Sequence, residues 1–127
     1  MRVQEAIPVF LVGDIASTMR WYAEQLGFQA HAVPSSPPHT FGILRKDDAT
    51  IFLQQLDGYR KPDLYAQREG GVWSVYLQVD EIQPLFDRLS KLEGVTILEP
   101  LCHQPYGQTE FVLSDPNGYA LVFAQSD

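Results

Sequence analysis

Hydrophobic residues along the chain follow two periods, one typical of strands and one typical of helices. The apolar run IPVFLV at residues 7–12 has the length of a strand. The apolar residues after it recur at steps of four, three and four, which is the spacing of one helix face. Asp14 before them suits an N-cap, and Gly27 after them suits a left-handed C-terminal position. These features predict a helix over residues 15–26. Its apolar positions are Ile15, Met19, Tyr22 and Leu26.

The same pattern is repeated later in the chain at a constant offset of 67 residues, so that Ile15 corresponds to Ile82 and Gly27 to Gly94. The stretch SVYLQVDEIQPLFDRLSKLEGV therefore predicts a strand and then a helix from about residue 81 to 93. A proline in the first turn of that helix costs little, because the N–H it lacks would have no partner there.

Three strand candidates follow each predicted helix. They are FQAHAV, TFGILRK and ATIFLQQ in the first half, and VTILEP, TEFVLS and YALVFA in the second. Turn residues such as KDD and DPNG separate them. Each half is therefore a βαβββ repeat, over about residues 5–56 and 72–125, with a polar linker at 57–71. Because neither half could cover its sheet alone, the two are expected to form a single α+β domain over residues 1–127.

The duplicated unit resembles the glyoxalase, bleomycin-resistance and extradiol-dioxygenase group, the vicinal oxygen chelate superfamily. Within that group it is most similar to the bleomycin-binding resistance proteins. The resemblance implies a glyoxalase-like fold, in which two βαβββ repeats form a curved mixed sheet around a cleft. The stretches that carry it are AIPVF (6–10), DIASTMRWYAEQLGF (14–28), FGILRKDDATIFL (41–53) and QPYGQTEFVLSDPNG (104–118).

The resemblance also implies where a metal would bind, because metal-dependent members hold one divalent ion with four residues from the first and fourth strands of each half. The matched positions are Ile7, Gln54, Ser74 and Val122, with an uncertainty of one residue at Gln54. Only Gln54 is a credible ligand, and one neutral amide does not retain a metal ion. The three histidines, His31, His39 and His103, lack metal-ligand spacing. We therefore predict no metal and no other cofactor.

Other catalytic patterns are absent from the sequence. There is no Gly-x-Ser-x-Gly elbow and no glycine-rich phosphate loop. Asp47 and Asp48 lie in the KDDA stretch, which is typical of a hairpin turn. Glu110 is the best isolated acid, but the sequence shows no partner base for it. The sequence therefore favours a protein that is not an enzyme.

Alternation of side chains along the predicted strands indicates which residues line the cleft. If Ser74 points inward, so do Tyr76 and Gln78, and the inward residues of the last strand are apolar and small. Aromatic and amide side chains of this kind suit a flat, partly apolar ligand and attract a cationic group. The resemblance adds Phe41 and Tyr106, which match aromatic residues that contact drug rings in bleomycin-binding proteins. The predicted ligand-binding residues are Phe41, Phe52, Gln54, Tyr76, Gln78, Tyr106 and Val122.

The net charge and the cysteine content limit which classes of partner and which cellular compartment the sequence favours. The net charge of −7 argues against nucleic acid or an anionic membrane as the main partner and favours attraction of a cation. The single cysteine, Cys102, excludes an internal disulfide and fits a reducing cytoplasm. The N-terminal residues read as neither a signal peptide nor a membrane span. Pro8 interrupts the first strand, as in relatives whose N-terminal strand crosses to a second subunit of a homodimer; the alternative is an edge-strand proline without a swap.

The leading hypothesis is a metal-free, non-catalytic homodimer of the bleomycin-resistance type, which sequesters a planar and cationic compound. The first alternative is a glyoxalase-like or dioxygenase-like metal-dependent enzyme with an atypical metal site. The second alternative is a sensor or accessory domain for a small metabolite. The residues at the four metal-ligand positions, Ile7, Gln54, Ser74 and Val122, discriminate between the binding protein and the enzyme.

Overall fold

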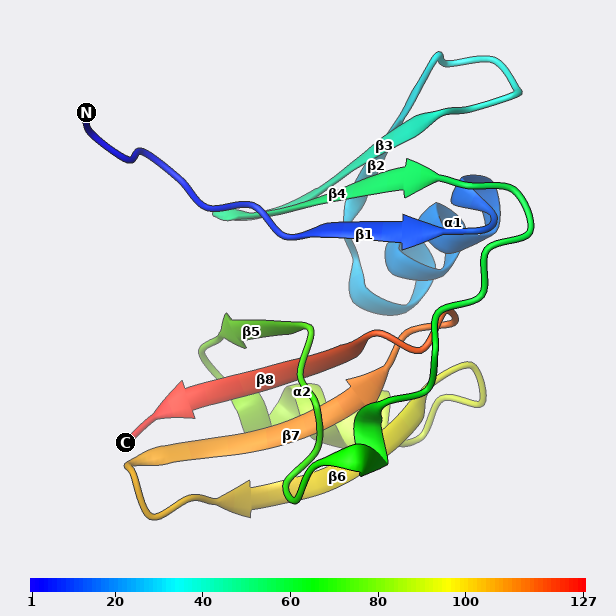
Figure 1. The fold of residues 1–127 in the computed structure, drawn as a ribbon. Helices are drawn as coiled ribbons and strands as arrows, with labels where there is room; N and C mark the ends of the chain where they lie inside the picture. Colours follow the sequence, from blue (N-terminus) through cyan, green and yellow to red (C-terminus); the bar gives the residue numbers. More distant parts are fainter. The chain divides into compact units, whose positions relative to one another are not determined.

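The chain is described by a computed structural model that covers residues 1–127. It divides into two compact units, Met1–Lys61 and Pro62–Asp127. In each unit one α-helix packs on one face of a four-stranded mixed sheet (Figure 1). The boundary between the units lies inside the linker predicted at residues 57–71. We call the face of each sheet that is turned away from its own helix the distal face.

The first unit has the strand order β1-β4-β3-β2. Strands β1 and β4 are parallel, and the other neighbouring pairs are antiparallel. Its elements are β1 (Val9–Val12), α1 (Ile15–Leu26), β2 (Gln29–Val33), β3 (Phe41–Lys46) and β4 (Ala49–Gln55).

The second unit repeats this arrangement, with the order β5-β8-β7-β6 and a parallel pair between β5 and β8. The duplicated βαβββ unit and the α+β class are therefore confirmed. Neither helix of the two units is long and apolar enough to cross a membrane. The elements of the second unit are η1 (Tyr65–Gln67), β5 (Val75–Gln78), α2 (Ile82–Leu89), β6 (Thr96–His103), β7 (Gln108–Ser114) and β8 (Ala120–Ser126).

Helix α1 begins and ends where the sequence predicts. The Asp14 carboxylate accepts a hydrogen bond from the Ser17 N–H at 3.1 Å, as an N-cap does. Gly27 ends the helix with a φ of 74°, in the left-handed region that suits glycine. Ile15, Tyr22 and Leu26 are buried against the sheet, as their spacing predicts.

The second helix is shorter than the predicted span of about 81–93. It ends at Leu89, after which the Lys91 and Leu92 N–H groups bond to carbonyls three residues back. Bonds of that spacing tighten the chain into turns and stop the α-helix. Strand β6, in turn, is longer than predicted and ends at His103, which therefore belongs to a strand and not to a loop.

A glutamine at the end of each central strand ties that strand to the start of the helix. The Ile15 N–H donates to Gln55 Oε1 at 2.9 Å, and the Ile82 N–H donates to Gln125 Oε1 at 2.9 Å. Both bonds satisfy a first-turn N–H that has no partner within the helix. This shared contact is a sign of the duplication that the sequence analysis did not identify.

Aromatic stacking identifies the helix face of the second sheet. The Phe111 ring lies 5.1 Å from the Phe86 ring of α2 and 5.1 Å from the Phe123 ring of β8. Because side chains alternate along a strand, the neighbours Glu110 and Val112 lie on the distal face. Pairing extends this assignment to β5 and β8, and it agrees with the faces expected from the sequence.

Candidate ligand-binding site

A buried carboxylate lies on the distal face of the second sheet. Glu110, in β7, has an exposed fraction of only 4%. It lies directly opposite Ala124 of β8 and Cys102 of β6. Its two hydrogen-bond partners are neutral phenols, and no ion pair includes it. A carboxylate so far removed from water and without a cation is costly, and such groups concentrate at functional sites.

Two tyrosines from different parts of the second unit donate to Glu110. The Tyr76 hydroxyl donates to Glu110 Oε2 at 2.5 Å, and the Tyr106 hydroxyl donates to Glu110 Oε1 at 2.7 Å. Tyr76 lies in β5, two strands away from β7, and reaches across β8 where the small side chain of Ala124 leaves room. Tyr106 comes from the turn between β6 and β7. The site therefore depends on three strands and one turn.

The phenols that donate to Glu110 are held in their protonated form. Partial burial, then the hydrogen bond to Glu110 and its negative charge, raises the pKa of Tyr106 from 10.0 to about 12. The same causes in the same order raise the pKa of Tyr76 further. Both hydroxyls are therefore donors at neutral pH, and neither is a candidate base.

Aromatic rings surround this carboxylate and remain accessible. The Trp73 ring lies 5.7 Å from the Tyr76 ring at an interplanar angle of 37°. The exposed fractions are 42% for Trp73, 38% for Tyr76 and 58% for Tyr106. Exposed aromatic rings beside a buried acid are suited to stacking on a planar group and to attracting a positive charge.

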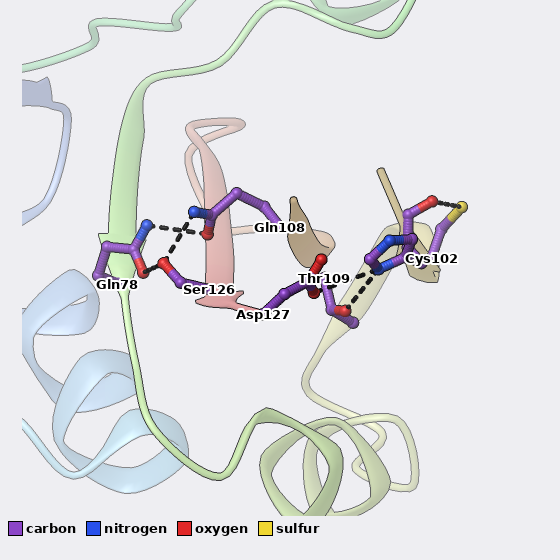
Figure 2. A network of polar contacts seen from close by, with 7 residues as sticks. Gln78, Cys102, Gln108, Thr109, Ser126 and Asp127 are labelled. Carbon is purple, nitrogen blue, oxygen red and sulfur yellow. Dashed lines mark hydrogen bonds and ion pairs between the residues drawn. The ribbon is translucent and has the colours of Figure 1, made fainter. Parts of the chain in front are cut away.

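Gln78, predicted as a ligand-contacting amide, is engaged by its neighbours in a ring of hydrogen bonds (Figure 2). Its Nε2 donates to Gln108 Oε1 at 2.9 Å, and Gln108 Nε2 donates to Ser126 Oγ at 2.8 Å. The Ser126 hydroxyl closes the ring on Gln78 Oε1 at 3.5 Å. A ligand that contacts Gln78 would use the capacity that these bonds leave, namely the second N–H of Nε2 and the second lone pair of Oε1.

Val122, predicted to line the ligand site, is completely buried. It forms a small core cluster with Val112 and Ala120, and Tyr65 and Leu98 pack against that cluster. Tyr65 belongs to η1 in the segment that precedes β5. A ligand could reach Val122 only if this cover moved. The Tyr65 hydroxyl is buried without a hydrogen-bond partner, and burial, followed by the charge of Glu99, raises its pKa.

The predicted residues of the first unit lie on its own distal face. Phe41 and Phe52 are in edge contact, with ring centroids 5.0 Å apart, and Gln54 is paired with Phe41. A Cβ atom at Gly42, the residue after Phe41, would lie against Ile15 of α1. The face of the sheet that carries Gly42 is therefore the helix face, and Phe41 and Phe52 lie on the other face. Both phenylalanines are half-buried, and Gln54 is exposed.

The strand register corrects one position of the metal quartet. Val9 pairs with Phe52 in the first unit, and Tyr76, its counterpart in the repeat, pairs with Val122. The position that matches Val122 is therefore Phe52, and the expectation of Gln54 was wrong by two residues. The error arose because it was counted through turns of unequal length, whereas the pairing measures the register directly.

The residues of the corrected quartet do not fit a metal ion. Ile7, Phe52 and Val122 offer only hydrocarbon, and the Ser74 hydroxyl accepts a hydrogen bond from the Ala120 N–H at 3.0 Å. No group of three or more His, Cys, Asp or Glu residues elsewhere in residues 1–127 could hold an ion. These four positions therefore lack the nitrogen, oxygen and sulfur ligands that a metal ion needs.

A sequence profile of the Glyoxalase/Bleomycin resistance protein/Dioxygenase superfamily matches residues 6–123. The chain belongs to this superfamily. The profile covers both βαβββ repeats, including β7 with Glu110 and most of β8. No curated protein matches the chain in sequence.

Solved structures share the fold of this superfamily member at low identity. A bleomycin-binding protein from Streptomyces verticillus, complexed with copper(II)-bleomycin, has a TM-score of 0.69 at 16% identity, covering 100% of this chain and 99% of its own. TioX from Micromonospora sp. ML1 has a TM-score of 0.73 at 17% identity, covering 98% and 97%. A glyoxalase-related enzyme from Clostridium phytofermentans has a TM-score of 0.76 at 16% identity, covering 100% and 98%. Identities this low establish the fold alone.

Alkaline titration should separate Tyr106 from the ordinary tyrosines of the chain. Phenolate absorbance of the native protein should contain a step near pH 12 from Tyr106, and Tyr106→Phe should remove it. Glu110→Gln should move this step toward the ordinary pKa of 10.0. Because the folded pKa lies above the unfolded one, the protonated phenol adds stability that is complete below about pH 10 and is lost as the pH rises through about 12. An unchanged titration curve in Glu110→Gln would contradict the hydrogen bond.

Proposed function

We propose that this chain is a metal-free binding protein of the bleomycin-resistance type, which sequesters a planar, cationic compound. The observation that carries the proposal is the set of exposed aromatic rings beside the buried carboxylate of Glu110. It is supported by the net charge of −7, which favours the approach of a cation. A solved structure with this fold, at 16% identity, is a bleomycin-binding protein complexed with copper(II)-bleomycin, which supports the proposal.

The proposal also includes ligand contacts in the first unit, where the ring pair Phe41 and Phe52 and the amide Gln54 lie on the distal face of that unit's own sheet. The protein works as a cytoplasmic homodimer, and an exchanged N-terminal segment near Pro8 is one way to form it. The Pro8 carbonyl accepts a hydrogen bond from the Phe52 N–H at 3.0 Å. In an exchanged dimer, this bond would form between the two chains. Sedimentation analysis of the purified chain tests the dimer.

The competing function is metal-dependent lyase, isomerase or dioxygenase chemistry at an atypical site. It conflicts with the hydrocarbon side chains of Ile7, Phe52 and Val122 at the ligand positions. Metal analysis of the purified protein, followed by assays with added Ni, Zn, Mn or Fe(II), tests this alternative. Stoichiometric, tightly held metal together with turnover would overturn the binding-protein proposal.

A thermal-shift screen with metal-free bleomycin, quinones and planar aromatic cations tests the proposal directly. A compound present at 100 times its dissociation constant should stabilise the protein by about 2.7 kcal/mol. Trp73→Ala should weaken binding of the compound by about fivefold, since aromatic contacts of this kind are worth about 1 kcal/mol beyond area burial. Leu64→Ala, at a side chain that is 47% exposed in the same unit, is the matched control and should leave affinity unchanged. A screen in which no planar compound stabilises the chain would contradict the proposal.

A further inference from the structure

We propose that the second unit contains a subsite for the charged end of a planar organic cation, in which Glu110 supplies the counter-charge and Trp73, Tyr76 and Tyr106 supply the ring contacts. This inference rests on the proposed binding function and deepens it, because it names the chemical class of the ligand and the residue that selects it. All four residues belong to the unit Pro62–Asp127.

The first argument is the uncompensated charge of Glu110. Its exposed fraction is 4%, and its partners are two neutral hydroxyl groups. Hydrogen bonds from phenols stabilise a carboxylate but do not neutralise it, whereas most buried charges are paired with an opposite charge. A ligand cation would supply the missing charge.

The second argument is the remaining hydrogen-bonding capacity of the carboxylate. Each oxygen of Glu110 accepts one bond, from Tyr76 or from Tyr106. An ionised carboxylate has about four acceptor sites, so capacity is left on both oxygens. A flat cation with two parallel N–H groups, such as an amidinium or guanidinium, matches two such oxygens.

The third argument is the aromatic surroundings, which favour a planar cation over a compact one. Trp73 and Tyr76 present tilted rings 5.7 Å apart, and both remain more than a third exposed. A cation over such faces is attracted by the ring quadrupoles, most strongly when the cation is desolvated. A divalent metal ion would gain little here, because Glu110 is a single carboxylate without further ionic ligands.

Cys102 provides a local reporter for this subsite. It is the only cysteine of the chain, it is exposed, and it lies directly opposite Glu110 in the β6–β7 pair. A cation bound at Glu110 should shield its thiol from a neutral alkylating reagent such as iodoacetamide. The rate of alkylation therefore reports occupancy at this position and not elsewhere on the protein.

The test compares benzamidine, a planar cation, with benzamide, its neutral isostere. On the unmodified protein, benzamidine should bind at least about tenfold more tightly than benzamide by calorimetry, and only benzamidine should slow alkylation of Cys102. Glu110→Gln should abolish this preference, and circular dichroism should show that the variant is folded. Glu99→Gln removes an exposed carboxylate from the neighbouring strand β6 and is the matched control, which should retain the preference.

The outcomes separate this inference from the binding function on which it rests. Equal binding of benzamidine and benzamide, or an unchanged preference in Glu110→Gln, would overturn the cation subsite while leaving the binding of planar compounds intact. No binding of benzamidine, together with stabilisation by neutral planar compounds in the thermal-shift screen, would do the same. If neither cationic nor neutral planar compounds bind, both proposals fail. Because the first comparison uses the natural sequence, it stands even if Glu110→Gln does not fold.

Discussion

Replacing Phe111 by alanine should lower the free energy of unfolding of the second unit by about 3–5 kcal/mol. The Phe111 side chain is completely buried, stacks on Phe123 at an interplanar angle of 15° and meets the ring of Phe86 edge-on. Its removal would leave a cavity between β7, β8 and α2 that three separate elements would have to fill. Close packing of interiors makes such a collapse incomplete.

Urea denaturation in a Trp21→Phe background, followed by the fluorescence of Trp73, measures this loss, because Trp73 lies in the same unit as Phe111. Leu64→Ala, at an exposed position of that unit, is the control and should change the free energy of unfolding by less than about 0.5 kcal/mol. A loss of less than about 1 kcal/mol for Phe111→Ala would show that α2 does not pack on the sheet through this residue.

Replacing Gly71 by alanine should destabilise the second unit by about 2–5 kcal/mol, for two separate reasons. Gly71 has a φ of 89°, where a side chain strains the backbone. In addition, a Cβ there would lie 2.4 Å from the ring carbons of Tyr65, and the Tyr65 ring is pressed onto Val112 and Val122. The ring cannot withdraw freely, because the Val72 N–H bonds to the Tyr65 carbonyl at 3.1 Å.

Three further variants separate the strain from the clash: Gly58→Ala, Tyr65→Ala, and Gly71→Ala combined with Tyr65→Ala. Gly58 has a φ of 77° with nothing within 4 Å of its Cβ position, so Gly58→Ala should cost only the backbone strain of about 1–2 kcal/mol. In a Tyr65→Ala background, Gly71→Ala should cost no more than Gly58→Ala. Equal effects of Gly71→Ala and Gly58→Ala in the natural background would mean that Tyr65 does not occupy the place described. Urea denaturation of the four variants supplies all the comparisons.

The position of Tyr65 also bears on binding. Its ring covers Val122, which the sequence assigns to the ligand site, while Tyr76 and Tyr106 remain exposed beside Glu110. The accessible aromatic surface of the second unit therefore lies toward Glu110 and away from the centre of β8. We therefore expect that a planar compound bound at Glu110 would leave the core cluster of Val112, Ala120 and Val122 undisturbed.

Local periodicity was sufficient to predict the elements of this fold. The helix Ile15–Leu26 agrees with its prediction at both ends, because its cap residues and apolar spacing are encoded within a few positions. The repeat offset revealed the duplication, and alternation along β5 and β8 gave the side chains that share a face with Tyr76 and with Val122. Each of these inferences depends only on residues that are close in the chain or on a constant spacing between copies.

The site was predicted only in part. Phe41, Phe52, Gln54, Tyr76, Gln78 and Tyr106 were chosen from strand faces and from resemblance, and their contacts with a ligand remain predictions. Glu110 was noted as an acid without a partner, although alternation from Val112 would have placed it on the distal face with Tyr76. No sequence signal indicated that Tyr65 would cover Val122, because its segment has neither a strand period nor a helix period.

The sequence by itself determined the duplicated βαβββ architecture, the helix start and end signals of α1, and which side chains alternate on each strand, since these follow from backbone geometry and nearest neighbours. Only the tertiary structure decided that Tyr76 meets Glu110 across 34 residues and over an intervening strand, and that Phe52 matches Val122. Contacts of this kind depend on strand register and on how far a side chain reaches, and neither is a property of any local stretch of sequence.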